Sequence, residues 1–453
     1  MRPAVEDRRR SGGSRAPAAP SARGAASFAS APVNGTADVG LVHGTMNETL
    51  TPGGTRVLTE SIPGVRSVSV GVWVRQGSAH EPPELYGASH LLEHLVFKGS
   101  TTRTPHQIAM ALERLGGSLD AFTSREHTSY QARVLSEHLP VAMDVLSDLV
   151  RNPLLRETDL ELEREVVLEE IATVEDVPDD LVFELHGEKL WGDHPYGHSI
   201  LGTADSVRSL PIEALREIHE RRYLGGELIV AAAGHLEHEQ VVEMVERHFS
   251  GTAGDAAEPI PWPQGDAPIG EIQVERSLAQ SHIVVGSRTP PRTDAARFPL
   301  VLVSSAFGGG MSSRLFQRIR EELAMAYSVY SFQAFHSRGG STGVYVGTRP
   351  GTAGKAIDAV LEEYQRLASE GLSGEELRKV KDQVKGQVML SLESTSSRLF
   401  RLAGFALYDQ PRLTLDELLQ AIETVSIEDV ADVSARFFDP EGQTILRLGP
   451  GHA

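Results

Sequence analysis

The sequence predicts an α+β fold built from two homologous halves, each a mixed, largely antiparallel β-sheet with helices packed on one face. Three observations support this prediction. Strand-like segments are separated by helices that come in blocks rather than singly. The same order of segments occurs twice along the chain, which indicates an internal duplication. A stretch rich in Gly, Pro, Ala and Asp separates the two copies, as a linker would.

The first half is expected over residues 38–249. Alternating Val and small or polar residues in "RSVSVGVWVRQGS" are typical of a strand with one buried face. The spacing of apolar residues in "PVAMDVLSDLV" is typical of an amphipathic helix. Strands are predicted within residues 66–78, 126–135 and 218–236, and helices within 88–100, 140–150 and 158–175.

The second half is expected over residues 272–453 and follows the same plan. It ends, like the first half, on a short β-rich segment, here "QTILRLGP". Strands are predicted within residues 280–291, 326–335, 341–349 and 434–450, and helices within 312–323, 355–367 and 374–392.

Two segments differ in composition from the rest. Residues 1–37 are rich in Arg, Ala, Ser, Gly and Pro, and we interpret them as a disordered tail. They lack the continuous apolar core of a secretory signal, and Glu6, Asp7 and scattered Gly and Pro interrupt an amphipathic helix. We therefore expect a cytoplasmic protein, with the mitochondrial matrix as the alternative. Residues 250–271 are interpreted as the linker between the halves.

The composition excludes several classes of function. The chain has no cysteine among its 453 residues, so any metal is bound by nitrogen and oxygen ligands. A formal net charge of −19 argues against a nucleic-acid partner, because phosphates would be repelled. The same charge suits a basic peptide. No apolar run reaches the roughly 18–20 residues that span a bilayer, so no membrane partner is expected.

The stretch "ASHLLEHLVFKGS", residues 88–100, places polar residues on an otherwise apolar helix. His90 and His94 are four residues apart, so both side chains lie on one face and can bind one cation. Glu93 is offset from them and is placed to hold a water molecule on that cation. The alternative is a pair of hydrogen-bonded core histidines. The glutamate between them favours a metal site instead, because the order H-x-x-E-H is the inverted zinc motif.

A third ligand is expected in "LELEREVVLEEIATVE". Glu163 and Glu170, seven residues apart, fall inside the apolar stripe of this helix, where an unpaired carboxylate would be costly. We assign Glu170 to the metal and interpret Glu161 and Glu169 as part of a solvated face. The residues expected to define the buried stripe are Val166, Val167, Ile171 and Val174.

With these residues the sequence resembles the pitrilysin/insulinase family of zinc peptidases over residues 40 to 450. The resemblance is strongest to bacterial processing proteases and to the β subunit of the mitochondrial processing peptidase. His90, His94 and Glu170 match the family's zinc ligands, Glu93 its general base, and Glu163 a carboxylate that supports the site. The resemblance implies one Zn²⁺ per chain and two halves that enclose a clam-shell chamber.

Two further segments carry the resemblance. "GGSLDAFTSREHTSY" is similar to the family's edge strand, which implies that Ala121, Phe122 and Thr123 pair with an extended peptide substrate. "RIREELAMAY" is similar to the second-half segment whose Arg and Tyr reach the scissile bond. The matching residues are Arg320 and Tyr327.

The resemblance implies a zinc metalloendopeptidase that hydrolyses short or unfolded peptides, including presequence-like or basic ones. The alternative is a non-catalytic scaffold or assembly subunit of the same fold. Because one chain carries both the zinc motif and the Arg–Tyr pair, a homodimer is favoured over a heterodimer.

Overall fold

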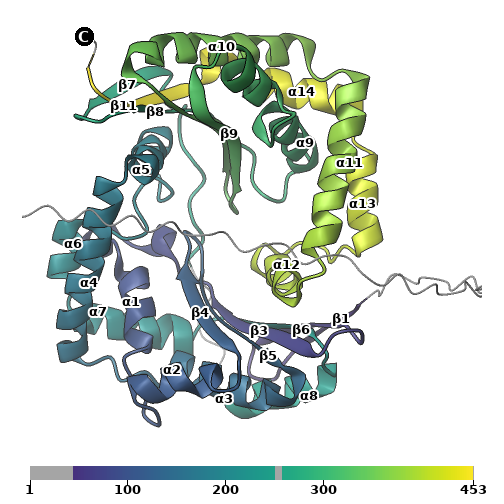
Figure 1. Ribbon diagram of the computed structural model, residues 1–453. Helices are drawn as coiled ribbons and strands as arrows, with labels where there is room; N and C mark the ends of the chain where they lie inside the picture. Colours follow the sequence, from purple (N-terminus) through teal and green to yellow (C-terminus); the bar gives the residue numbers. More distant parts are fainter. Residues whose placement is uncertain (1–43, 250–257, 452–453) are drawn as a thin grey trace, which may run out of the picture. The chain divides into compact units, whose positions relative to one another are not determined.

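The computed structural model describes residues 44–249 and 258–451, and within them the strands form two β-sheets (Figure 1). The first sheet has the order β1-β2-β6-β3-β5-β4 and the second has the order β7-β11-β8-β10-β9. The predicted α+β fold is therefore confirmed. The strands are β1 (Thr45–Leu50), β2 (Arg56–Ser61), β3 (Ser67–Val74), β4 (Ser118–Thr123), β5 (Thr128–Leu135), β6 (Leu228–Gly234), β7 (Gly270–Glu275), β8 (Ser281–Thr289), β9 (Ala326–Phe335), β10 (Gly340–Thr348) and β11 (Thr444–Gly449).

The two sheets have the same topology once β1 is set aside. In the first sheet β2 and β6 pair in parallel, and the other neighbours pair antiparallel. In the second sheet β7 and β11 are the parallel pair, and again the other neighbours are antiparallel. The strands therefore correspond one to one in chain order and direction, which confirms the internal duplication.

The three segments predicted as helices in the first half are helical, as α1, α3 and α4, and five further α-helices of this half were not predicted. α3 starts with a proline in its first turn, where the missing N–H costs nothing, and it buries Val145, Leu146 and Leu149. A short π-helix, η4 (His219–Leu224), precedes β6. The α-helices are α1 (Ala88–Val96), α2 (Pro105–Glu113), α3 (Leu139–Arg151), α4 (Glu157–Asp176), α5 (Pro178–Trp191), α6 (Ala204–Ser209), α7 (Ile212–Ile218) and α8 (His238–His248).

The second half departs from the prediction in two respects. The helix expected within residues 312–323 is wound as a π-helix, η5 (Phe316–Glu322), and Leu323 donates its N–H to the carbonyl of Arg318. Four helices, α9, α12, α13 and α14, had no predicted counterpart. The α-helices are α9 (Arg297–Gly308), α10 (Ala353–Glu370), α11 (Gly374–Ser391), α12 (Thr395–Leu407), α13 (Leu415–Glu423) and α14 (Ile427–Phe437).

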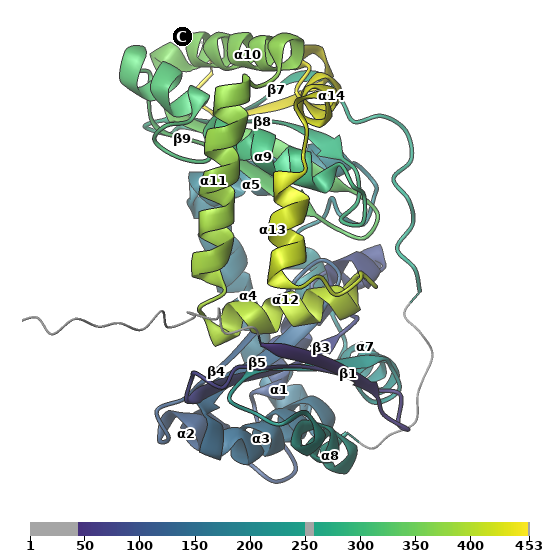
Figure 2. The ribbon, with the colours of Figure 1, turned by 90° about the vertical axis from the view of Figure 1, so that its right-hand side faces the viewer.

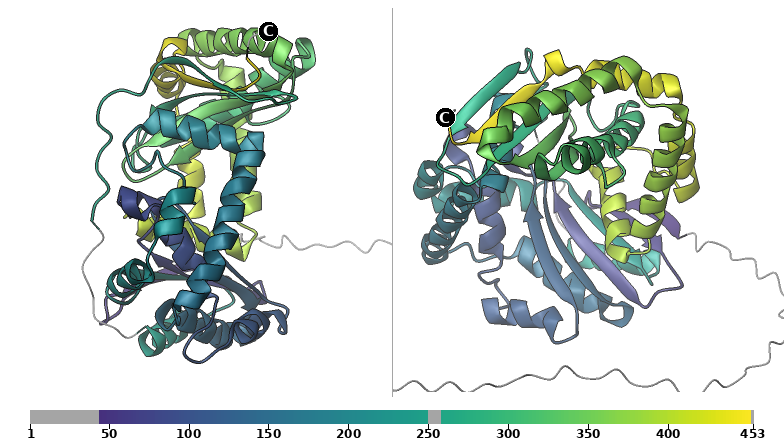
Figure 3. Two further views of the ribbon diagram at one scale, coloured as in Figure 1. Left: turned by 90° about the vertical axis from the view of Figure 1, so that its left-hand side faces the viewer. Right: turned by 45° about the horizontal axis from the view of Figure 1, so that its top comes forward.

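Each sheet is covered on one face by helices of its own half. On β3, Val68, Val70 and Val72 point into a core shared with α1 and α3. In the second sheet, Val285 and Val344 point into a core shared with α9, α10 and α14. Figure 3 shows α10, in green, extended over the second sheet.

The other face of each sheet is covered by a helix from the opposite half. Trp73 and Ile229 of the first sheet pack against Leu399 and Leu402 of α12, which Figure 1 shows against this sheet. Val182 of α5 packs in turn against Val284, Tyr345 and Leu446 of the second sheet. The expectation of helices on one face therefore holds only for the helices of the same half.

The segment between the halves lies partly outside the described residues. The predicted tail, residues 1–37, and part of the predicted linker, 250–257, are not described. Residues 258–269 contain no helix or strand, and β7 begins at Gly270. No helix in the described part of the chain is long and apolar enough to cross a membrane.

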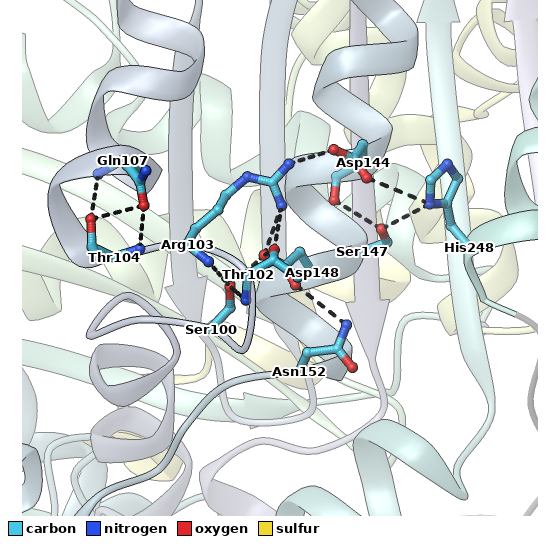
Figure 4. A network of polar contacts seen from close by, with 10 residues as sticks. All are labelled: Ser100, Thr102, Arg103, Thr104, Gln107, Asp144, Ser147, Asp148, Asn152 and His248. Atoms are coloured by element: carbon cyan, nitrogen blue, oxygen red, sulfur yellow. Dashed lines mark hydrogen bonds and ion pairs between the residues drawn. The ribbon is translucent and has the colours of Figure 1, made fainter.

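A polar network fixes the loop between α1 and α2 to α3 (Figure 4). The Asp148 carboxylate on α3 accepts hydrogen bonds from Ser100, from Thr102 at 2.7 Å and from Arg103 at 2.7 Å. Arg103 also pairs with Asp144, one turn earlier on α3. Burial alone would raise the pKa of Asp148, but these hydrogen bonds and the Arg103 charge hold it below its usual value. The loop that follows the candidate metal-binding helix is thereby anchored.

Replacing Asp148 by Asn should lower the free energy of unfolding by about 1–3 kcal/mol at pH 7, because three donors lose a buried anionic acceptor. Since the folded-state pKa is depressed, this contribution is present above the unfolded pKa of about 3.9 and disappears as the pH falls through the folded value. Urea denaturation at several pH values measures both effects. The control is Asp144→Asn, whose side chain is 49 % exposed and should cost below about 1 kcal/mol. Equal losses for the two variants would contradict the assignment of Asp148 as the centre of the network.

Candidate metal centre

The helix α1 begins at an unusual N-terminus. Gly87, its N-cap, has a φ of 93° and provides no side-chain cap. The carboxylate of Glu81 accepts hydrogen bonds from the N–H groups of Gly87 at 2.8 Å and Ser89 at 2.6 Å instead. Burial raises the pKa of Glu81 to about 7. This contact satisfies helix donors that would otherwise be unpaired, and it fixes the start of α1.

His90 and His94 lie on one face of α1, and α4 places Glu170 beside them. The Glu170 Oε2 atom is 3.7 Å from His90 Nε2 and 3.8 Å from His94 Nε2. Among the described residues this is the one cluster of three or more His, Asp or Glu residues whose ligand atoms all lie within 4.8 Å of one another. The structure therefore brings together the three residues that the sequence singled out as ligands.

The donor set fits a zinc ion. The separations of 3.7 and 3.8 Å exceed hydrogen-bond length. Ligand atoms about 2.0–2.1 Å from a tetrahedral zinc lie about 3.3–3.4 Å apart, so a small closure would accommodate the ion. Burial, together with the neighbouring His94, lowers the pKa of His90 to about 4, so its imidazole is neutral at pH 7 and keeps a lone pair. Two imidazoles and one carboxylate are a catalytic zinc set that leaves a position open.

Glu163, two turns before Glu170 on α4, supports this cluster. Its side chain is buried, and its Oε2 atom is 3.1 Å from His94 Nδ1. Its other oxygen is 2.6 Å from the Lys98 ammonium. A carboxylate on Nδ1 holds the imidazole so that Nε2 faces the cation. His90 Nδ1 is buried and has no hydrogen-bond partner in the described part of the chain.

Glu93 is held beside the cluster by the end of β4. Its Oε2 atom accepts a hydrogen bond from the Thr123 hydroxyl at 2.6 Å. Burial raises the pKa of Glu93 above the ordinary value for glutamate, and the Thr123 hydrogen bond partly offsets this. The Glu93 carboxylate is thus positioned through Oε2, and its Oε1 atom remains available for proton transfer.

The strand that carries Thr123 is an edge strand. β4 pairs with β5 on one side, and no other strand of the described chain pairs with its second side. Ala121, Phe122 and Thr123 therefore belong to a strand that can accept an additional strand. The Phe122 ring packs near His127 at 5.7 Å and Phe400 of α12 at 5.8 Å, measured between ring centroids.

Arg320 and Tyr327 contact each other but not the candidate zinc ligands. Arg320, on η5, donates a hydrogen bond to the Tyr327 carbonyl at 3.0 Å, and its guanidinium lies 4.6 Å from the centre of the Tyr327 ring. Tyr327 is 78 % exposed at the start of the edge strand β9. The hydrogen bonds, ion pairs and ring contacts of Arg320 and Tyr327 in the described part of the chain do not include His90, Glu93 or Glu170.

The buried stripe of α4 differs from its prediction. The buried residues are Leu160, Glu163 and Val167, whereas Val166 is exposed. Glu170 is only partly buried, with 41 % of its side chain exposed. The prediction was wrong for Val166 alone, which lies about 100° around the helix from Val167 and so falls outside the face that Val167, Ile171 and Val174 share.

Sequence reasoning also missed three supporting residues. Lys98 lies four residues after His94, so helical spacing was a usable signal for its contact with Glu163. Thr123 was expected only to bind substrate, and Glu81 lies in a loop without a periodic pattern. Thr123 and Glu93 are 30 residues apart in the chain, and Glu81 reaches Gly87 and Ser89 from a loop, so helical or strand periodicity reveals neither contact.

An inverted H-x-x-E-H motif on a helix of a duplicated α+β fold is the mark of the inverzincin class. Comparison with known families agrees with this class. Residues 56–204 match the family described as Insulinase (Peptidase family M16), and residues 209–384 match the Peptidase M16 inactive domain. The chain therefore belongs to peptidase family M16, the insulinase family, which confirms the resemblance found in the sequence.

Curated relatives align over most of the chain. An uncharacterized zinc protease of Streptomyces coelicolor is 38% identical over 398 residues, which cover 86% of this chain and 87% of the relative. An uncharacterized zinc protease of Mycobacterium leprae is 39% identical over 386 residues, covering 84% and 87%. The uncharacterized zinc protease YmxG of Bacillus subtilis is 35% identical over 386 residues, covering 85% and 94%.

Solved structures show the same fold. The peptidase M16 inactive domain from Pseudomonas fluorescens superposes with a TM-score of 0.84 at 19% identity, covering 90% of this chain and 99% of that one. A protease from Helicobacter pylori superposes with a TM-score of 0.83 at 21% identity, covering 90% and 100%.

Replacing Glu163 by Gln should weaken zinc affinity by about 10–100-fold, because the amide no longer holds His94 as a carboxylate does. Competition with a zinc-binding dye measures the change. Glu161→Gln, an exposed position on the same helix, is the matched control and should leave the affinity unchanged. Complete loss of zinc in Glu163→Gln but not in Glu170→Gln would show that the two carboxylates have exchanged roles.

Proposed function

We propose that the protein is a zinc-dependent endopeptidase that cleaves short or unfolded peptides. The observation that carries the proposal is the convergence of His90, His94 and Glu170, with Glu93 held next to them by Thr123. The names of the relatives, which are zinc proteases, support the same activity. We further propose that it acts in the cytoplasm, since these relatives come from bacteria.

The residues of the site can divide the reaction between them. Zinc, when bound, supplies a Lewis acid that polarises the scissile carbonyl and lowers the pKa of water in its shell. Glu93 takes a proton from the attacking water and returns it to the leaving amine. Thr123 keeps the Glu93 carboxylate in place during both transfers. Glu163 and Lys98 hold the His94 ring.

The edge strand β4 supplies the binding site for an extended peptide. Its free side offers N–H and C=O groups that can pair with the peptide backbone, so binding depends little on the side-chain sequence. The exposed carboxylate of Glu165 on α4 and the net charge of −19 favour basic, presequence-like peptides.

Replacing Glu93 by Gln should leave zinc content near one per chain and reduce turnover by about 10²–10⁴-fold, because an amide cannot accept the proton. Replacing Glu170 by Gln should remove zinc and activity together. The measurements are metal analysis of the purified protein and mass spectrometry of an unstructured peptide library, with and without chelator.

Glu169→Gln, an exposed neighbour of Glu170 on the same helix, serves as the control and should match the wild type in both measurements. Peptide cleavage that is unaffected by chelator would refute zinc-dependent catalysis. A wild-type protein that binds zinc but cleaves no peptide in the library would favour the scaffold alternative.

We also propose that the protein works as a homodimer in which Arg320 and Tyr327 of one copy face the metal centre of the other. The exposure of Tyr327, and the absence of contacts from this pair to the metal centre of its own chain in the described residues, support this arrangement. Hydrogen bonds from the pair would stabilise the oxyanion that forms during attack.

A mixing experiment tests this arrangement. Tyr327→Phe should lose about 10²–10³-fold in kcat, and Glu93→Gln is inactive for a different reason. A mixed dimer of the two variants should regain activity, because one of its sites has Glu93 on one chain and Tyr327 on the other. If mixed dimers form but activity does not return, the pair acts within its own chain or not at all.

A further inference from the structure

A cavity of about 510 Å³ lies among helices of the second half and reaches Trp73 and His127 of the first, and none of the candidate zinc ligands lines it. Its walls come mainly from α9, α11, α12 and α13, which Figure 2 shows close to one another, and from the end of β9. Most of the lining is apolar. The apolar lining residues are Trp73, Phe298, Val301, Leu302, Phe335, Val384, Val388, Phe400, Phe405, Leu407, Leu413, Leu418 and Ile422.

The charged residues of this cavity are all arginines. Arg292, Arg297 and Arg401 line it, and no aspartate or glutamate does. The ion pairs of the described residues include none of these three arginines. Arg292 Nε and Arg297 Nη1 share a neutral acceptor, the Gln410 side-chain oxygen, at 3.3 and 3.2 Å. Arg401 donates to the Leu413 carbonyl.

Aromatic rings provide the remaining contacts of these guanidinium groups. Arg292 lies 4.6 Å from the centre of the Tyr408 ring, and Arg297 lies 4.8 Å from that of Phe298. Such contacts orient a cation but leave its charge uncompensated. Burial, with a contribution from Arg292, lowers the pKa of Arg297 to about 10. Two partly buried cations side by side are costly in a chain that carries 62 acidic residues elsewhere.

We propose that this cavity binds a long-chain monocarboxylate, with its carboxylate on Arg292 and Arg297 and its hydrocarbon chain between α9, α11 and α12. The anionic end matches the two guanidinium groups, which can donate paired hydrogen bonds. The volume lies within the range of about 300–1,000 Å³ that small-molecule sites occupy.

A ligand with one polar end fits the lining better than a peptide does. A peptide would bring backbone N–H and C=O groups into an apolar space, and each would need a partner. The Gln410 side chain is already used, because its oxygen accepts from both arginines and its nitrogen donates to the Arg292 carbonyl at 3.1 Å. The site requires neither the zinc cluster nor the edge strand β4, so it stands independently of the proposed peptidase activity.

The test is calorimetric titration of the full-length chain with dodecanoate, dodecan-1-ol and dodecyltrimethylammonium, which share a chain length and differ in charge. Dodecanoate should bind saturably at one per chain, and the alcohol and the cation should bind at least about tenfold more weakly. The double variant Arg292→Gln/Arg297→Gln should lose about tenfold or more in dodecanoate affinity. Arg436→Gln, an exposed arginine that also stacks on an aromatic ring, is the control and should bind as the wild type does.

A second variant keeps the test decisive if the double variant fails to fold. Val388→Trp, from a half-buried position on α11, narrows the hydrocarbon end of the cavity and should reduce dodecanoate affinity while both arginines remain. Thermal unfolding reports whether each variant is folded. Equal affinity for dodecanoate and dodecan-1-ol, or wild-type affinity in a folded variant of either kind, would overturn the proposal.

Discussion

Both faces of each β-sheet in this protein are apolar, and the arrangement of the helices follows from the need to cover both. Strand β3 shows the constraint directly, since Val70 and Val72 point to one side and Trp73 to the other, and all are buried. Helices of the same half cover one side of each sheet. The second side is covered by exchange, with α12 on the first sheet and α5 on the second. Burial of apolar surface, worth roughly 25 cal/mol per Å², therefore joins the two halves of the described chain.

Polar contacts add specificity where the halves meet. Glu126, in the turn after β4, accepts hydrogen bonds from the Tyr196 hydroxyl and from the backbone N–H of Ser337, which precedes β10. These donors, with a smaller effect from His336, outweigh burial and hold the pKa of Glu126 below its ordinary value. The carboxylate is thus fully used as an acceptor at a place where an unpaired charge would oppose the contact.

Buried charge is handled differently at the two sites described above. Around the metal cluster, Glu163 is buried, but Lys98 and His94 both approach it, so its charge is compensated within the protein. In the cavity between α9, α11 and α12, the guanidinium groups of Arg292 and Arg297 share one neutral amide oxygen. The first arrangement is complete with respect to charge, and the second lacks an anion.

The sequence by itself determined the duplicated α+β plan, the helix with His90 and His94 on one face and Glu93 offset from them, and the two carboxylates Glu163 and Glu170 within the apolar stripe of α4. These features are local, because the period of apolar residues decides which face of a helix or strand is buried. Only the tertiary structure decided that α5 and α12 exchange between sheets, that Val166 faces solvent, that η5 is wound as a π-helix, and that Thr123 holds Glu93. The approach of α4 to α1 also brings Glu170 within 3.8 Å of both imidazoles, although 75 residues and several other elements separate it from His94 in the chain. Such contacts depend on how all apolar faces are covered at once, and no short window of sequence contains that information.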